Sequence, residues 1–195
     1  PIYNGSATVA TSPIPKITTG HNENSNPYTQ NIEKAKQLLA EAGYADGFNI
    51  VLNVNEDNQR VDTAVVIQDN LKAIGINVEI KTYQWASYVA FVENPAQEKG
   101  MFLMAWNIAN DDPDELLYPL YHSSQIDAHT NVIFYKNEEF DNLISKARET
   151  TDKEKRIELY KKAQDIIQEE LPHYAILYPM QNFAYKKSIK GIEVS

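Results

Sequence analysis

The sequence predicts an α/β fold in which a mixed, partly parallel sheet is flanked by helices. Apolar residues at helical spacing alternate along the chain with apolar residues at strand spacing. A pair of longer helical patterns stands near the end. The 195 residues are 43% hydrophobic and 23% charged, which suits one globular domain with a sizeable core. We expect about three to five strands in the sheet.

Residues 1–30 predict an extended lead-in, because prolines and small polar residues dominate them. Apolar residues within the lead-in indicate that parts of it are packed on the rest of the protein. These residues are Ile2, Tyr3, Val9, Ile14 and Ile17. Residues 31–195 are expected to form the α/β domain itself.

The first half of this domain alternates helices and strands. Asn31 is a suitable N-cap, and Gly43 and Gly75 suit the positions that follow helix ends. Phe48, Ile50 and the alternate residues after them show the period of a strand. The expected elements are a helix over 31–42, a strand over 48–54, a helix over 58–73, a strand over 76–83 and a short helix over 85–93.

The second half begins with Met101–Trp106, a nearly continuous apolar run. Such a run predicts a central strand that is covered on both faces. Ligands gather beyond the carboxyl ends of strands in these sheets, and residues 107–112 occupy that position. The remaining expected elements are a short helix over 116–121, helices over 138–149 and 152–170, and strands in "YAILYP" and "FAYKKSIKGIEVS".

Carboxylates cluster directly after this strand, in the segment "NDDPDE" over residues 110–115. Asp112 before Pro113 fits an N-cap followed by proline at the first helical position. Asp114 and Glu115 would favour the positive end of the helix dipole. Convergent oxygens would also suit a divalent metal, but the spacing is not that of an EF-hand. The helix start is the favoured interpretation, and no metal ligand is predicted.

Composition excludes several classes of function. A net charge of −9 offers no basic face for nucleic acid, and the absence of cysteine removes thiolate catalysis and Cys-based zinc sites. No window approaches the about 18 apolar residues of a membrane span. There is neither a Gly-rich phosphate loop nor an HExxH or GxSxG motif, so no cofactor and no catalytic residue are predicted. The chain begins with Pro1, and we expect a mature chain or a part of a longer one.

Four stretches, in this order, resemble a known family: "NIEKAKQLLAEAGYADGFNIVL", "IQDNLKAIGINVEIKTYQWASY", "MAWNIANDDPDELLYPLYHS" and "NEEFDNLISKARETTDKEKRIELYKKAQDIIQEELPHYAILYP". The chain is similar, over nearly its whole length, to the C-terminal lobe of the family 5 extracellular solute-binding proteins. These are the oligopeptide-, dipeptide- and nickel-binding components of ABC importers, and the dipeptide-binding type is the most similar. The resemblance implies one lobe of a two-lobed periplasmic-binding-protein-like fold. It also implies that residues 1–30 are packed on a ligand-binding lobe formed by residues 31–195.

The resemblance places a ligand site in the stretch "WNIANDDPD". In dipeptide-binding relatives an aspartate there holds the α-amino group of the peptide, and an alignment without gaps puts Ala109 at its position. A methyl group cannot pair with an ammonium, so Asn110 or Asp111 substitutes for it, or the ligand presents no free amine there. Dipeptide-type relatives use an arginine for the ligand carboxylate in the region before the second helix. Arg60 lies in that region, although the spacing around it is shorter here, and a solvated arginine at a helix start is the alternative. The predicted ligand-binding residues are Trp106, Asn107, Ile108, Ala109, Asn110, Asp111, Arg60 and Trp85.

The resemblance implies a binding protein that is not an enzyme. It would capture a small solute, with short peptides favoured, and deliver it to an ABC permease in the membrane. The other lobe of the same chain would complete the site. The location would be the periplasm, or the outer face of the cell membrane with a lipid anchor in a Gram-positive host. A hydrolase that uses a metal or a carboxylate pair at residues 110–115 is the alternative.

Overall fold

The computed structural model describes residues 2–22, 28–180, 182, 184–186 and 188–191. Among these residues, no helix combines the length and the apolar composition that a membrane crossing requires. The elements are β1 (Ala7–Val9), α1 (Ile32–Glu41), β2 (Phe48–Asn55), α2 (Asn58–Lys72), β3 (Ile76–Tyr83), α3 (Trp85–Glu93), β4 (Met101–Phe102), α4 (Asp114–Tyr121), the 3₁₀ turn η1 (Ser123–Gln125), α5 (Glu138–Glu149), α6 (Lys153–Glu170) and β5 (Leu177–Pro179).

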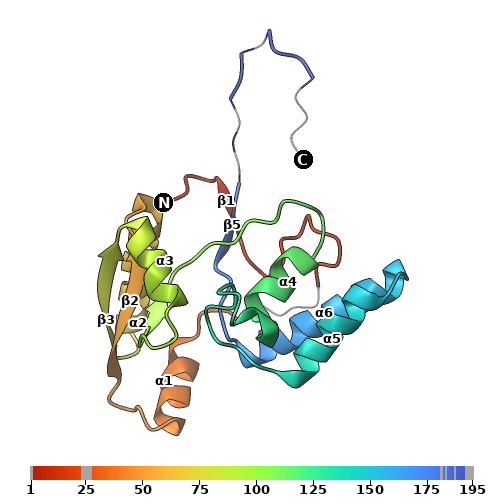
Figure 1. The fold of residues 1–195 in the computed structure, drawn as a ribbon. Helices are drawn as coiled ribbons and strands as arrows, with labels where there is room; N and C mark the ends of the chain where they lie inside the picture. The colour runs from red at the N-terminus through yellow and green to blue at the C-terminus, as the bar shows by residue number, and fades with distance from the viewer. Residues whose placement is uncertain (1, 23–27, 181, 183, 187, 192–195) are drawn as a thin grey trace.

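A parallel three-stranded sheet in the order β3–β2–β4 forms one half of the molecule (Figure 1). Strands β2 and β3 pair along their whole length, from Phe48 opposite Ile76 to Asn55 opposite Tyr83. Helix α2 is the crossover between them and packs on both. The α/β architecture and these elements are confirmed. A first core lies here, and its buried residues are Leu52, Val54, Ala64, Ile76 and Val78.

The strand predicted over Met101–Trp106 was wrong in length and in position. Strand β4 has two residues and, within the part of the chain that the structure describes, pairs with β2 alone at the edge of the sheet, whereas β2 is central. After Leu103, whose amide still bonds to the Asn53 carbonyl at 3.0 Å, the chain leaves the sheet. The apolar side chains beyond this point are not core residues, because Met104 and Trp106 are each 40% exposed.

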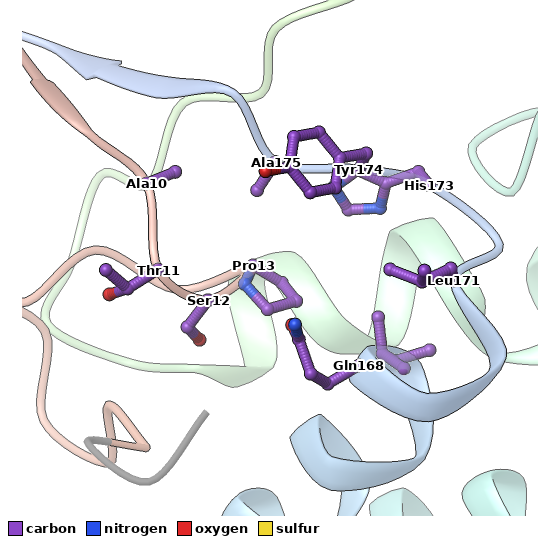
Figure 2. A pocket seen from close by; sticks show the side chains of 10 residues that line it. Ala10, Thr11, Ser12, Pro13, Gln168, Leu171, His173, Tyr174 and Ala175 are labelled. Atoms are coloured by element: carbon purple, nitrogen blue, oxygen red, sulfur yellow. The ribbon is translucent and has the colours of Figure 1, made fainter. Parts of the chain in front are cut away.

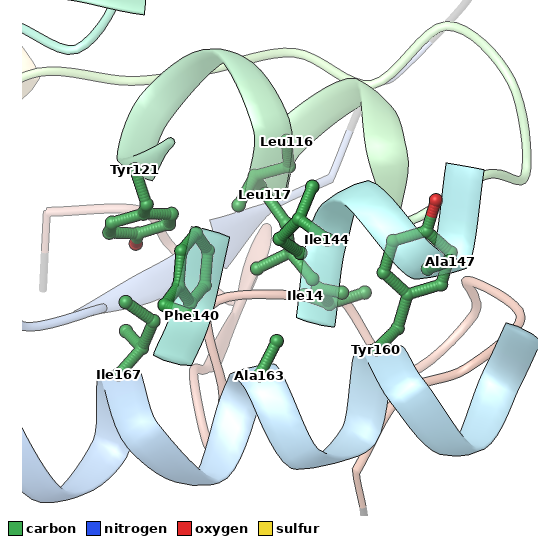
Figure 3. Close-up of a cluster of buried hydrophobic side chains, with 10 residues drawn as sticks. All are labelled: Ile14, Leu116, Leu117, Tyr121, Phe140, Ile144, Ala147, Tyr160, Ala163 and Ile167. Carbon is green, nitrogen blue, oxygen red and sulfur yellow. The ribbon is translucent and has the colours of Figure 1, made fainter. Parts of the chain in front are cut away.

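Helices α4, α5 and α6 form the other half of the molecule, around a second core (Figures 1 and 3). Their predicted positions are confirmed. The side chains of Asn137 and Asp152 cap α5 and α6, and α6 ends at a left-handed Leu171 directly before Pro172. The buried residues of this core are Ile14, Leu116, Leu117, Tyr121, Phe140, Ile144, Ala147, Tyr160, Ala163 and Ile167.

The lead-in is packed on this helical half through Ile14, which is fully buried. Val9 and Ile17 were expected to be packed as well, but they are 77% and 91% exposed. Val9 lies on β1, which among the described residues pairs only with β5 in a two-stranded antiparallel ribbon, and a lone ribbon leaves side chains in solvent. The two strands predicted at the end differ in outcome. Strand β5 falls within "YAILYP", whereas residues 184–186 and 188–191 contain no strand and the rest of "FAYKKSIKGIEVS" lies outside the described residues.

Gln164 fastens the lead-in to α6 with a buried amide. Its Oε1 accepts hydrogen bonds from Ser12 Oγ at 2.8 Å and from the Asn22 amide at 3.2 Å. Its Nε2 donates to the carbonyls of Gly20 at 2.8 Å and Tyr160 at 3.1 Å. The side chain therefore uses both ends of its amide, as a fully buried glutamine must.

The stability of the helical half depends on pH through His173. Its ring stacks on Tyr121 and hydrogen-bonds to the Tyr121 hydroxyl. Burial lowers the pKa of His173 from 6.5 to about 4, so the unfolded chain binds the proton more strongly than the folded one. The stability that neutral His173 contributes is therefore complete above pH 6.5 and is lost as the pH falls toward 4.

We expect wild-type protein to lose about 2 kcal/mol more stability than His173→Gln between pH 7 and pH 5. Urea denaturation at both pH values measures the difference, and acid effects on the carboxylates cancel because both proteins share them. The exposed His129 provides the control, since His129→Asn should keep the wild-type pH dependence. Equal losses of stability in wild type and His173→Gln would contradict the assignment of this pH dependence to His173.

Candidate ligand-binding site

Three segments leave the parallel sheet at the carboxyl ends of its strands. Arg60 lies in the first turn of α2 after β2, Trp85 begins α3 after β3, and residues 103–111 follow β4. Parallel strands place their carboxyl ends at the same edge, which is where α/β sheets bind ligands. The sequence-predicted site residues all belong to these three segments.

Arg60 and Trp85 lie together. The Arg60 guanidinium carbon is 5.7 Å from the centre of the Trp85 ring, and its Nη1 donates to Asn55 Oδ1 at 2.6 Å. Trp85 is half exposed, and no ion pair of Arg60 occurs within the described part of the chain. This pair offers a positive charge beside an accessible aromatic face, which suits an anionic or aromatic group.

The chain after β4 has no regular secondary structure and its main chain is open. No hydrogen bond to the main chain of residues 104–108 occurs within the described residues. Ile108 packs against the second core, while the neighbouring Asn107 is exposed. Trp106 donates its indole N–H to the Glu115 carbonyl at 2.7 Å. Residues 104–108 thus present free amides and carbonyls beside an unpaired sheet edge.

Glu115 organises the end of this segment. One of its carboxylate oxygens, Oε2, accepts the amide N–H groups of Ala109 at 2.7 Å and Asn110 at 2.9 Å. The other oxygen accepts the Asn110 side-chain amide. The Asn110 amide, with these other donors, holds the pKa of the Glu115 carboxyl below its usual range. Glu115 is a site residue that the sequence does not reveal, because its position in the first helical turn indicates only a dipole role.

The remaining carboxylates after β4 have separate partners. Asp111 accepts the hydroxyl and the amide of Thr19, and these bonds lower the pKa of Asp111. Asp112 forms a bidentate pair with Arg156, with both N–O distances at 3.0 Å. Asp114 accepts the Tyr160 hydroxyl at 3.1 Å.

Asp112 also accepts the Asp114 amide at 3.0 Å, and Pro113 already has helical φ and ψ of −59° and −24°. A helix does begin here, as predicted, but the predicted cap is wrong by one residue: α4 begins at Asp114, and Pro113, not Asp112, is its N-cap residue and forms no side-chain cap. No group of three or more His, Asp or Glu side chains in the described part of the chain could hold a metal ion.

A hydrolytic triad is not assembled around His122 either. The Ser124 amide donates to His122 Nδ1 at 3.2 Å, which makes Nδ1 an acceptor and leaves the proton of the neutral ring on Nε2. The Nε2 atom lies 3.3 Å from Ser145 Oγ and therefore cannot remove a proton from it. Asp141, 3.9 Å from Nδ1, finds no N–H there to orient.

A small pocket between the lead-in and the end of α6 does not provide a solute site. Figure 2 shows Thr11, Pro13, His173 and Tyr174 around it. Its volume of about 10 Å³ leaves room for about one water molecule. The region beyond the carboxyl ends of the strands is the better candidate for a solute-binding site.

The sequence profile described as "Bacterial extracellular solute-binding proteins, family 5 Middle" matches residues 1–128 of the chain. The chain belongs to this family of bacterial solute-binding proteins. The family 5 assignment agrees with the resemblance found in the sequence and leaves the hydrolase alternative without support.

Individual relatives match nearly the whole of this family 5 chain. It is 34% identical over 97% of its length to heme-binding protein A of Haemophilus influenzae. It is 32% identical over 99% of its length to the dipeptide-binding protein of Escherichia coli. The chain spans 35% and 37% of the lengths of these two curated relatives.

The fold is confirmed by a solved structure, the periplasmic binding protein DppA from Helicobacter pylori in complex with the peptide STSA. The TM-score is 0.85 at 35% sequence identity, over 91% of this family 5 chain and 34% of that protein.

Removal of the Asp112–Arg156 pair tests whether this pair anchors the segment after β4. Arg156→Ala removes both charge-assisted bonds, together with the Arg156 bonds to the Ala147 carbonyl and the Tyr160 hydroxyl, and should lower the free energy of unfolding by about 2 kcal/mol. Lys155→Ala, at the exposed neighbouring position on α6, should change it by less than about 0.5 kcal/mol. Urea denaturation compares the two variants, and equal midpoints would show that the pair does not anchor the segment.

Proposed function

We propose that the protein that carries this chain is the solute-binding component of an ABC importer and that it binds short peptides. The open main chain of residues 104–108 carries the proposal. An extended peptide beside this segment would exchange main-chain hydrogen bonds with it, which gives affinity that does not depend on peptide side chains. Trp106, 40% exposed in the same segment, would cover part of the peptide.

Related proteins support the choice of peptides. The relatives include proteins named for dipeptides and for oligopeptides, and solved relatives hold the peptide STSA and the dipeptide Met-Leu. A relative named for heme shows that a different solute class is associated with a similar chain. The substrate of this protein is therefore assigned from the open main chain together with the peptide-binding relatives.

The remaining predicted site residues receive specific roles in this proposal. Arg60, which has no described acidic partner, would pair with a ligand carboxylate, and Trp85 would line the same end of the site. Ala109 supplies no charge for a ligand amine. Asn107, Ile108, Asn110 and Asp111 would form the rest of this wall. The opposing wall would come from the other lobe of the full-length protein.

The mechanism is non-covalent and not enzymatic. Closure of two lobes would bury the peptide, and the closed form would dock on the permease. The protein would work outside the cytoplasmic membrane, in the periplasm or lipid-anchored on the outer face of the cell. Each carboxylate after β4 is occupied with protein partners, which agrees with a binding role rather than a hydrolytic one.

Native mass spectrometry on the full-length protein, purified gently from its host, tests the solute class. We expect a co-purified mass that fragments as a peptide, and the fragment pattern will show whether its amino terminus is free. A co-purified sugar or metal chelate would overturn the peptide assignment.

Calorimetry with tetrapeptides tests recognition through the main chain. Methylation of one central peptide nitrogen removes a donor and should weaken binding about tenfold. Exchange of a central side chain for alanine should change the affinity by less than about threefold. The opposite order would show that side chains, not the main chain, dominate recognition.

A further inference from the structure

The segment that would bind the ligand has few internal contacts of its own. Its first residue, Leu103, is tied to the sheet through the Asn53 carbonyl and the Tyr88 hydroxyl. Beyond it, the main chain of residues 104–108 makes no described hydrogen bond. Residues without such bonds retain much of their conformational freedom. A contact near the carboxyl end of residues 104–108 must therefore hold them if they are to bind a ligand in one conformation.

Glu115 makes every described hydrogen bond that ties residues 106–110 to α4. Its main-chain carbonyl accepts the Trp106 indole N–H at 2.7 Å. Its carboxylate accepts the amides of Ala109 and Asn110 and the Asn110 side chain. One residue thus contacts both ends of a five-residue stretch, and it fixes the direction in which the intervening residues Asn107 and Ile108 run.

The position of Glu115 is itself fixed. It lies in the first turn of α4, where its amide bonds to the Asp112 carbonyl at 3.2 Å. The next two residues, Leu116 and Leu117, are buried in the second core. Asp112 is in turn held by the bidentate pair with Arg156 on α6. Glu115 therefore attaches the segment to the rigid helical half by hydrogen bonds, in addition to the packing of Ile108 against the second core.

We propose that Glu115 is a positioning residue for ligand binding, which holds residues 106–110 in the one conformation that leaves the main chain of residues 104–108 open. This inference rests on the proposed function, because it assigns those residues to the ligand. Glu115 does not contact the ligand in this proposal. Its effect on affinity is that a larger fraction of the free protein is already in the binding-competent conformation.

Amide hydrogen exchange on the ligand-free, full-length protein tests the positioning without any ligand. In Glu115→Ala, the amides of Ala109 and Asn110 should exchange at least about tenfold faster, since their acceptor is gone. The Trp106 indole N–H keeps its main-chain acceptor in this variant, so a shift of its resonance reports movement of the segment, and we expect such a shift. Unchanged exchange and an unchanged indole signal would overturn the proposal, whatever the solute proves to be.

Calorimetry with the tetrapeptide that binds wild type best tests the consequence for affinity. Glu115→Ala should bind about tenfold more weakly, as expected if the competent fraction falls about tenfold. Glu115→Gln keeps an acceptor for the two amides and should recover part of the loss. The matched control is Glu138→Gln, which removes a charge from the exposed first turn of α5 and should bind as wild type does.

The outcomes separate the two proposals. If wild type binds no peptide while exchange at Ala109 and Asn110 rises in Glu115→Ala, the peptide assignment fails and the positioning role stands for another solute. If peptide binds wild type and Glu115→Ala equally, the positioning proposal fails and the peptide assignment stands. Tighter binding by Glu115→Ala would mean that the carboxylate occupies amides the ligand needs, and would also overturn the proposal.

Discussion

The buried amide of Gln164 is the constraint on which the arrangement of the helical half depends. A glutamine that is fully buried on α6 must find partners for its oxygen and its nitrogen, or it would cost stability. The lead-in supplies most of them, through Ser12, Gly20 and Asn22. These bonds hold the lead-in across α6, which brings Ile14 into the second core. The need of the buried Gln164 amide for hydrogen-bond partners thus holds the lead-in, which has little regular structure, against the second core.

The consequences of this attachment reach the candidate site. Thr19 belongs to the part of the lead-in that Gln164 fixes, and it holds Asp111. Arg156, two turns before Gln164 on the same helix, holds Asp112. The segment after β4 is therefore attached at one end to the sheet and at the other end to the helical half. Its geometry depends on the relation between two separate cores, and not on either one alone.

The sequence alone was sufficient for most of the fold. Local signals determine the helices, because Asn31, Asn137 and Asp152 cap them with their own side chains. The position of β4 could not be predicted in this way. An apolar run indicates burial, but Met104 and Trp106 are exposed in this structure, beside a site whose opposing wall would come from elsewhere.

The candidate site was predicted as a region, and its connections were not. The strand order places Arg60, Trp85 and the start of the segment after β4 at the carboxyl ends of the strands, as the α/β pattern indicates. Arg60 and Trp85 are in contact, whereas residues 106–111 are held by Glu115 and Thr19 of the helical half. The pairing of Asp111 with Thr19 spans 92 residues, and no local pattern indicates it. The contact of Glu115 with the amides of Ala109 and Asn110 depends on a turn that the residue types do not specify.

The short, open edge of β4 has a consequence for self-association. Unpaired amides and carbonyls beside a sheet are available to any extended chain, including an edge of a second copy of the same protein. A long flat strand there would favour edge-to-edge aggregation whenever the ligand is absent. Strand β4 pairs over only two residues before the chain turns away toward α4. Its free edge is therefore long enough to bind a short peptide but too short to pair stably with a strand of another sheet.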